Sequence, residues 1–417
     1  MNHFLGCSGL MSCSPKGLLF RRTKKKRGIF LLLAILLIGA IVFAGGGIAA
    51  KAYTQEEEEA LEELDEQVKE LLEALDTEDL QEYLDSLEDY QGTDIKESIS
   101  DLITGNFSLD YTSLWQSVLS LVWQEGRSML PAFAVILAAT LLCGILNSAK
   151  NGFLHSTMSD IINFSAYISV GAVVLAVLSG LLQTGFSAME SMRTQMEIVY
   201  PLLLTLMAAS GGSVSAGVFR PAVAFLSSGI CELFTAVVLP SSVAVIVLAF
   251  VGNLSPDVRT EKLGDFFKSI NKWLIGLTLG LFTLFLTVQG IASSQYDGLS
   301  LRAIKYLVSG SVPIVGGFLS GGVDLVLAGS ALIKNAIGSF AVFLLLGALL
   351  RPVLLFAAFQ LFLRLSAAVT EPIGGKVSAF LTRLASDCGF FLAGLLCIAF
   401  LYFLTIVLLV CSTGVIF

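Results

Sequence analysis

The chain has 417 residues, of which 55% are hydrophobic and 14% are charged, and its mean hydropathy is +0.83. Soluble domains carry about 25% charged residues, so the composition excludes a soluble globular protein. The formal net charge of −8 is unevenly distributed, because residues 56–101 hold twenty of the thirty-three acidic side chains and only two lysines. The rest of the chain offers no basic surface for nucleic acid. The seven cysteines show no spacing typical of a disulfide framework or a zinc site.

Residues 1–52 have the order of a secretory signal. A basic cluster at residues 21–27 precedes an apolar run at residues 29–44, and Ala50-Lys51-Ala52 offers a cleavage site between small residues. The stretch from Gly28 to Ala50 is also long enough to act as an uncleaved anchor. In both cases the basic cluster stays in the cytoplasm, so we expect the chain from residue 53 onward to lie on the opposite side.

Residues 53–105 form an acidic segment that we expect to be helical and extracytoplasmic. Its apolar residues recur at spacings of three and four, which places them on one face of a helix. They are Leu61, Leu64, Val68, Leu71 and Leu75, followed by Leu80, Leu84 and Leu87. Residues 76–79 are a typical start for a second helix. The segment is either a docking surface or short coiled coil, or a solvated hairpin folded against the protein's own membrane domain.

Residues 106–417 are predicted to be a multipass membrane domain. Five apolar runs approach the ~20 residues that a spanning helix needs, at residues 129–146, 161–182, 221–239, 273–291 and 390–411. Four shorter runs, 199–209, 241–254, 336–350 and 352–363, fit half-helices, re-entrant segments or short packed spans. Residues 107–123 and 183–198 are amphipathic and typical of interfacial helices. The predicted fold class is therefore an all-α polytopic membrane protein with short, broken or re-entrant segments.

Two loops carry a local excess of basic side chains. They are residues 255–272, with Arg259, Lys262, Lys268 and Lys272, and residues 364–383, with Arg364, Lys376 and Arg383. Under the positive-inside rule both loops should face the cytoplasm. Three crossings before residue 255 satisfy this expectation, whereas one more crossing by a short segment would reverse it.

Small and polar residues interrupt the apolar sequence twice. The residues concerned are Pro201, Ser210, Gly211, Gly212, Ser213 and Pro221 in the first break, and Gly310 and Pro313 in the second. Irregular backbone is stable at membrane depth only where protein or water satisfies its polar groups. Paired Gly/Pro breaks mark the binding sites of many secondary transporters. Alternatively, small residues let helices pack closely, so the breaks indicate either a polar path or close packing.

Three charged residues lie within or beside these apolar segments. Glu232 follows Pro221 inside an apolar run, Asp324 follows the second break, and Lys334 begins the next run. An ionised group at the centre of a membrane helix costs ~2.5–3.5 kcal/mol on insertion scales, so such groups usually face protein or water. Glu232 and Asp324 either line a polar path or are neutralised by Arg220 or Lys334.

The sequence gives little support for catalysis. His3 and His155 are the only histidines, and neither has partners at the spacing of metal ligands. The serines near Gly212 lack the G-x-S-x-G turn of a nucleophile, and no Walker-type phosphate loop occurs. We therefore predict a protein that is not an enzyme and holds no cofactor or metal.

The first break also carries a family resemblance. Residues 200–216, YPLLLTLMAASGGSVSA, with Pro221 after them, resemble the signature of the stage III sporulation protein AE family. Four later segments agree with that family in the same order: DGLSLRAIK at 297–305, VPIVG at 312–316, ALIKN at 331–335 and EPIGG at 371–375. The resemblance covers roughly residues 110–410.

The resemblance implies a multipass protein of the mother-cell membrane around the forespore of an endospore-forming bacterium. Its implied partners are the lipid bilayer, the other proteins of the stage III AA–AH channel assembly, and a forespore-membrane protein that the assembly meets. The implied role is a membrane platform or a transport subunit of that channel, needed for development of the engulfed forespore. A permease that moves a small solute through a path at the helix breaks is the alternative. The family supplies no catalytic or ligand-binding residues.

Overall fold

The computed structural model describes residues 66–87, 92–104, 111–153, 156–254, 260–311, 316–372 and 375–412. The predicted signal sequence, residues 1–52, lies outside these ranges. All the regular secondary structure within them is helical. An all-α fold is what the long apolar runs and the absence of alternating strand patterns predict.

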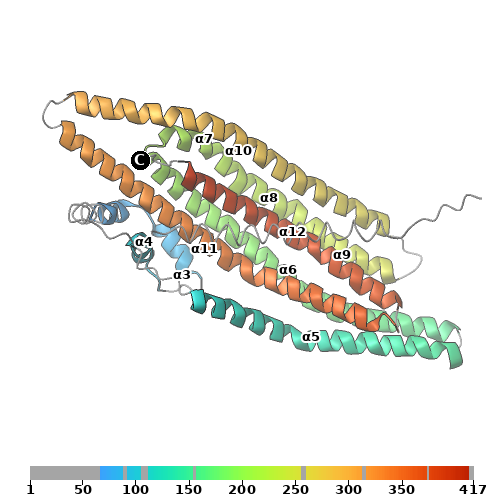
Figure 1. The fold of residues 1–417 in the computed structure, drawn as a ribbon. Coiled ribbons are helices and arrows are strands. Elements are labelled where there is room, and N and C mark those ends of the chain that lie inside the picture. Colours follow the sequence, from blue (N-terminus) through green and yellow to red (C-terminus); the bar gives the residue numbers. More distant parts are fainter. Residues whose placement is uncertain are drawn as a thin grey trace, which may run out of the picture.

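The described residues form six long helical segments, which lie side by side in a bundle (Figure 1). Five of them are single helices: α5 (Tyr111–Phe153), α6 (Ser156–Ala209), α10 (Glu261–Ser311), α11 (Gly316–Thr370) and α12 (Gly375–Cys411). The sixth is a composite helix made of α7 (Ser213–Ala224), η1 (Phe225–Ile230), α8 (Cys231–Leu233), η2 (Phe234–Val238) and α9 (Leu239–Leu254). Successive segments run in opposite directions (Figure 1).

The two ends of the bundle differ in what they carry. At one end, Ser412 donates a hydrogen bond to the sulfur of Met207, which joins the end of α12 to the end of α6 (3.5 Å). We call this the acidic end, because the acidic helices pack near it (Figure 1). At the other end, Arg383 of α12 pairs with Glu261 of α10 (2.7 Å). We call this the loop end, because the basic segments predicted to face the cytoplasm begin there.

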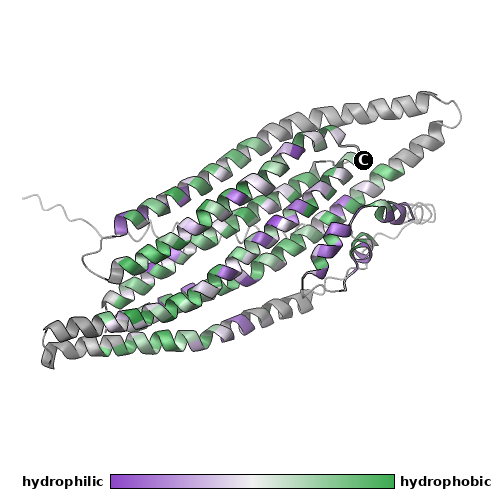
Figure 2. Ribbon diagram, turned by 180° about the vertical axis from the view of Figure 1, so that it is seen from behind, coloured by the Kyte–Doolittle hydropathy of each residue, from purple (hydrophilic) through white to green (hydrophobic). Residues whose placement is uncertain are grey.

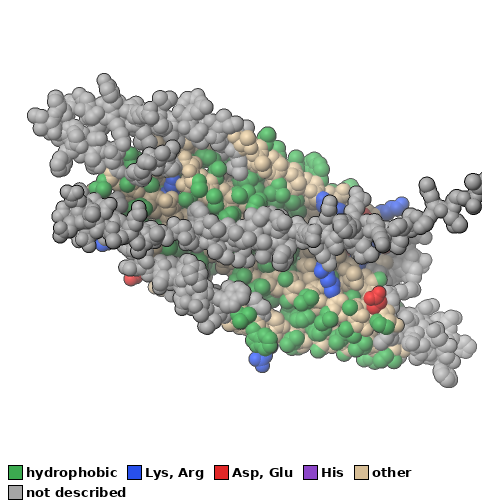
Figure 3. Space-filling model, in the orientation of Figure 1, with side chains coloured by type: hydrophobic (Ala, Val, Ile, Leu, Met, Phe, Trp, Pro, Cys, Tyr) green, Lys and Arg blue, Asp and Glu red, His purple; other side chains and the backbone are tan. Residues whose placement is uncertain are grey.

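The structure confirms a helical membrane protein with several spans. Within the described residues, five helical stretches are long and apolar enough to cross a bilayer: Trp123–Leu142, Tyr167–Ala209, Ser213–Gly252, Leu325–Thr370 and Val377–Cys411. In the coloured part of the bundle hydrophobic residues predominate, whereas the short acidic helices carry many hydrophilic ones (Figure 2). On the face drawn in Figure 3, the described side chains are mostly hydrophobic, with few charged ones among them.

Several segments expected to be separate prove to be parts of the same long helices. Residues 161–182, 183–198 and 199–209 all belong to α6, and residues 336–350 and 352–363 both belong to α11. Pro201 and Pro352 lie inside these helices without ending them. Neighbouring helices can satisfy the backbone groups that a membrane proline frees, which explains why the prolines do not divide the spans.

Aromatic side chains fill the centre of the bundle. α11 contacts α5, α6 and α12, and the rings of Phe356 and Phe391 stack between α11 and α12 with centroids 5.1 Å apart. Nearer the loop end, Tyr167 stacks on Phe250 and meets Phe380 edge to face. Such pairs add about 0.5–1.5 kcal/mol to the burial of the rings, so they join helices that are distant in sequence.

The acidic segment folds against the bundle. It contains a helix over residues 66–74, α3 (Glu78–Asp85) and α4 (Ile95–Thr104). Val68, Leu80 and Leu84 are buried, as the spacing of the apolar residues predicts. Leu71 lies against Gly329 of α11, where a Cβ would be 3.0 Å from it. The described residues of the segment are packed on the membrane domain, whereas its use as a docking surface stays a prediction.

Candidate functional site

The first sequence break is a compact turn at the acidic end. The amide of Gly212 donates to the carbonyl of Met207 (2.9 Å), and the amide of Gly211 donates to that of Ala208 (3.2 Å). Gly211 has a φ of 91°. These two bonds and the positive φ form a Schellman motif, which ends a helix and satisfies its last carbonyls. The irregular backbone is thus confined to Ser210, Gly211 and Gly212.

The residues on both sides of this turn are helical. Ser213 begins α7, Pro221 lies inside α7, and Pro201 lies inside α6. The predicted break between residues 201 and 221 is therefore much narrower in the structure than in the sequence. Proline is tolerated inside membrane helices when surrounding groups compensate for it, so Pro201 and Pro221 did not mark non-helical backbone, whereas Gly211 and Gly212 did.

Part of the second break lies outside the described residues. Gly310 is part of α10, whereas Pro313 falls in residues 312–315, which the structure does not describe. Asp324 belongs to α11, but its side chain is outside the described set. The pairing of the two breaks, and the role of Asp324 in a path, therefore remain predictions.

Glu232 lies in the irregular part of the composite helix. The π-helical segments η1 and η2 flank the three residues of α8, with Glu232 at their centre. Its carboxylate pairs with Arg193 of α6 (3.3 Å) and not with Arg220. The side chain of Glu232 is 61% exposed. The sequence gave no signal of this irregular helix. π-helical turns occur frequently at functional sites, so the segment around Glu232 is a candidate site.

Lys334 is buried near the acidic end of the bundle. The residue is 1% exposed and lies near Cys411, the last residue of α12. One turn further along α11, Gly338 packs against Val410. Among the described residues, no carboxylate forms an ion pair with Lys334. Helix C-termini carry partial negative charge, so the end of α12 supplies an electrostatic partner of the right sign.

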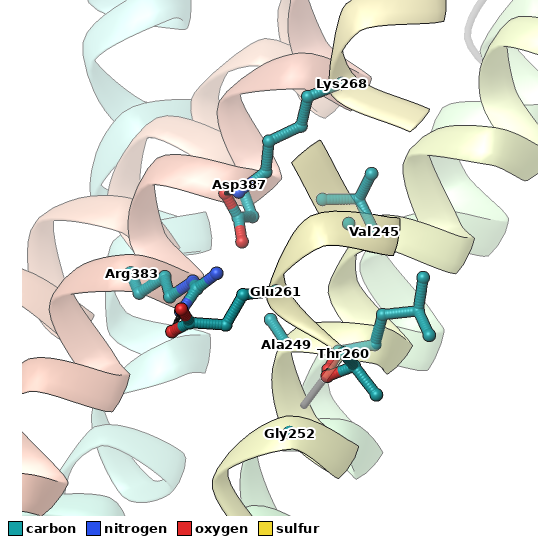
Figure 4. Close-up of a pocket in the computed structure, with 10 residues that line it drawn as sticks. Val245, Ala249, Gly252, Thr260, Glu261, Lys268, Arg383 and Asp387 are labelled. Carbon is teal, nitrogen blue, oxygen red and sulfur yellow. Dashed lines mark hydrogen bonds and ion pairs between the residues drawn. The ribbon is translucent and has the colours of Figure 1, made fainter. Parts of the chain in front are cut away.

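A second polar site lies near the loop end, between α9, α10 and α12 (Figure 4). It is a cavity of about 10 Å³, a volume that suits a single water molecule. Small residues on two walls leave this space: Ala249 and Gly252 on α9, and Gly264 on α10. Thr260 closes one side by donating its hydroxyl to the carbonyl of Leu248 (2.8 Å).

Two ion pairs join α10 to α12 beside this cavity. Lys268 Nζ lies 2.7 Å from Asp387 Oδ1, and Arg383 pairs with Glu261. Figure 4 shows Asp387 and Arg383 on α12, facing Lys268 and Glu261 across the cavity. The Asp387 side chain is only 3% exposed, whereas that of Glu261 is 71% exposed. One pair is therefore buried, and the other lies at the mouth of the cavity.

One oxygen of Asp387 has no hydrogen-bond partner. Oδ1 receives Lys268, but Oδ2 is buried and accepts no hydrogen bond from any described residue. A buried polar atom without a partner costs about 1–3 kcal/mol, and more if it is charged. Sequence reasoning missed this residue because it placed the last span at residues 390–411. The available signal was that Asp387 is the only acidic residue from 372 to 417.

A buried polar cluster continues from this site along α9 and α10. Asn271, one turn after Lys268, is fully buried, and its amide donates to Ser242 Oγ (2.9 Å). Ser241 donates to the Asn271 carbonyl oxygen and is also close to the carbonyl of Val238. These side chains satisfy one another, so the unpartnered Asp387 Oδ2 is not a general feature of the α9–α10 interface.

Three comparisons relate the chain to known proteins. The family model described as stage III sporulation protein AE matches residues 93–413. The stage III sporulation protein AE of Bacillus subtilis (strain 168) is 24% identical over 383 residues, covering 90% of this chain and 96% of that protein. No solved structure matches the chain.

Proposed function

The chain belongs to the stage III sporulation protein AE family, and we propose that it is a multipass membrane subunit of the sporulation channel that links mother cell and forespore. In this role it acts as a membrane platform, or as a transport subunit, in the mother-cell membrane around the engulfed forespore. It assembles there with the other stage III channel proteins. The proposed role requires no catalysis by this chain.

The observation that carries the proposal is the extent of the similarity. The matched residues, 93–413, begin at α4 and continue to the end of α12. The alignment with the Bacillus subtilis protein covers nearly the whole of both chains. The shared unit thus includes the membrane bundle and at least one of the helices docked on it, which supports a common role for the entire assembly.

The acidic helices support a role in the space between the two membranes. They follow a signal-like segment in the sequence and pack at one end of the bundle. Tyr83 of α3 accepts a hydrogen bond from Gln195 of α6 (2.9 Å), and Gln195 also lies near the carbonyl of Leu344 on α11 (3.4 Å). A platform that meets a forespore-membrane partner needs such a fixed extracytoplasmic surface.

The alternative, a solute path at the helix breaks, receives less support. Such a path would use backbone dipoles left unpaired at broken helices. At Gly211 and Gly212, however, the Schellman bonds pair the amides with carbonyls of α6. Among the described residues the first break therefore favours a turn over a path.

Two measurements test the proposed function. In the organism that carries the gene, we expect its deletion to stop development of the engulfed forespore, and a tagged full-length chain to co-purify with the other stage III proteins. Normal spore formation after deletion, or a pull-down from sporulating cells that lacks those proteins, would contradict the proposal.

A matched pair of variants locates the partner-binding surface. Leu84 is fully buried and Glu82 is exposed on the same helix, α3. We expect Leu84→Asp to detach α3 and to reduce recovery of the partners, with normal insertion of the bundle. Glu82→Gln is expected to leave recovery unchanged. Equal recovery from both variants would exclude the acidic helices from partner binding.

A further inference from the structure

The buried carboxylate of Asp387 has a geometry that its ion pair does not explain. One oxygen binds Lys268, while the other faces a water-sized cavity with no donor among the described residues. An ionised carboxylate accepts at both oxygens, and leaving one of them buried without a donor is unfavourable. A proton on Oδ2 would convert that oxygen into a donor.

Lys268 has a second carboxylate within reach. Its Nζ lies 2.7 Å from Asp387 and 3.9 Å from Asp265 Oδ1, three residues earlier on α10. Asp265 is 72% exposed. The ammonium group thus lies between a buried carboxylate on α12 and an exposed one on its own helix, so a small movement exchanges one partner for the other.

We propose that Asp387 is a proton-binding site that exchanges its ion pair with Lys268 for a proton. A hydronium ion at the mouth of the cavity gives its proton to Asp387 Oδ2, which forms an O–H bond and leaves a water molecule. Lys268 keeps its own proton and pairs with Asp265. The five charged groups of the site, including Glu261 and Arg383, change from a net charge of −1 to zero.

The surroundings allow this exchange. On α10, Lys268 and Asp265 face Asp387, and on α12 Arg383 lies one turn before it. The α9 wall is uncharged and consists of Val245, Leu248, Ala249 and Gly252. The exposed Glu261 at the mouth gives the cavity contact with solvent at the loop end. Protons can therefore arrive from that side without crossing the bundle.

Protonation would break one of the two ion pairs between α10 and α12. The buried pair, Lys268–Asp387, is replaced by the Lys268–Asp265 pair within α10, while the Arg383–Glu261 pair remains. Binding of a proton thereby changes how the start of α10 is held against α12. This inference rests on the cavity and its charges, and does not depend on the proposed role in the sporulation channel.

Infrared difference spectroscopy tests the proposal directly. The full-length protein is reconstituted in lipid vesicles and compared at neutral and acidic pH. A protonated carboxylic acid in an apolar site gives a C=O stretching band separate from that of a carboxylate. We expect such a band to appear on acidification in the wild-type protein and to be lost in Asp387→Asn. Glu97→Gln, at an exposed carboxylate of α4 at the other end of the bundle, is the control in which the Asp387 band is retained.

A second variant keeps the proposal testable if Asp387→Asn does not fold. Lys268→Met removes the cation that holds Asp387 ionised, and a buried carboxylate without a partner becomes neutral rather than remaining charged. We expect this variant to show the band already at neutral pH. The proposal is overturned if the band is absent from Lys268→Met and from the acidified wild type, or if it persists unchanged in Asp387→Asn.

Discussion

At the scale of single residues, Gly185 shows how tightly the bundle is packed. A Cβ on Gly185 would lie 2.3 Å from a ring carbon of Phe391 and 3.4 Å from Phe356. Gly180, on the same helix, has no heavy atom within 4 Å of such a Cβ. The rings of Phe391 and Phe356 therefore leave no room for a side chain at residue 185, whereas a side chain at residue 180 meets nothing.

These two glycines give a matched pair of predictions for stability. We expect Gly185→Ala to destabilise the protein by about 1–3 kcal/mol, because overpacking displaces the rings. Gly180→Ala should be neutral or stabilising, since alanine is the better helix former. Thermal unfolding of the purified protein, followed by loss of helical circular dichroism, measures both. Equal midpoints for the two variants would show that the ring contact does not constrain residue 185.

A substitution at Glu232 distinguishes a membrane platform from a protein that transports a solute. Its ion pair with Arg193 is exposed, and such pairs contribute about 0.2–1 kcal/mol. We expect Glu232→Gln to unfold within about 1 kcal/mol of the wild type and to leave spore counts unchanged. If spore formation stops while the protein level and its assembly stay normal, the carboxylate has a role in transport that a platform does not require.

Residue-scale prediction from the sequence succeeded where charge and spacing were sufficient. The buried face of the acidic helices, with Val68, Leu80 and Leu84, follows from its periodicity. The buried position of Asp387 could not be predicted in this way, because it depends on Lys268, more than a hundred residues earlier in the sequence. Nothing in a single sequence states that these two side chains meet.

At the scale of elements, α6 shows why helix boundaries were harder to predict. Residues 183–198 carry Glu190, Arg193 and Glu197, which suggested a separate interfacial helix. In the structure these charges lie on the outer side, while Met192 and Met196 of the same turns are fully buried. The helix continues because α11 and α12 cover its apolar side. These are tertiary contacts, which the local sequence pattern does not show.

The docking of α3 on the bundle has a predictable pH dependence. Burial raises the pKa of the Tyr83 phenol, and its hydrogen bonds to Gln195 and Ser191 only partly oppose this. A raised pKa means that the folded state favours the neutral phenol. The associated stability is fully present below the ordinary value of about 10 and is lost as the pH rises through the higher folded-state pKa.

The measurement compares the wild type with Tyr83→Phe. Thermal unfolding is followed from about pH 8 to above pH 10, where tyrosines ionise. We expect the wild type to lose stability more steeply than Tyr83→Phe across this window, because the variant has no phenol to ionise at the interface. Parallel curves would mean that α3 is not held at this point in solution.

At the scale of the whole molecule, the bundle is longer than a bilayer is thick. Helices α6, α10 and α11 have 54, 51 and 55 residues, or about 80 Å each at 1.5 Å per residue. The hydrocarbon core measures about 30 Å, and the observed tilts of membrane helices, up to about 40°, do not absorb the difference. We therefore expect part of the bundle to project from the membrane.

The positive-inside rule gives a direction to the bundle. The loop end carries Lys268 and Arg383, together with the basic segments that start there, and the acidic end carries α3 and α4. Three helical segments precede residue 255, as the charge distribution of the loops requires. With six segments in alternating directions, the start of α5 and the end of α12 lie at the same end, so we expect both to be extracytoplasmic.

Thiol labelling with a membrane-impermeant maleimide tests this orientation in intact protoplasts of cells that produce the protein without sporulating, so that the extracytoplasmic side of the membrane faces the medium. The native Cys411 is exposed at the acidic end, whereas Cys231, Cys388 and Cys397 are buried. In a chain with serine at the remaining cysteines, we expect Cys411 and an added Ser213→Cys to be labelled from outside. Glu261→Cys, at the loop end, should react only after the membrane is permeabilised. Labelling of Glu261→Cys in intact protoplasts, with Ser213→Cys protected, would reverse the orientation and place the acidic helices in the cytoplasm.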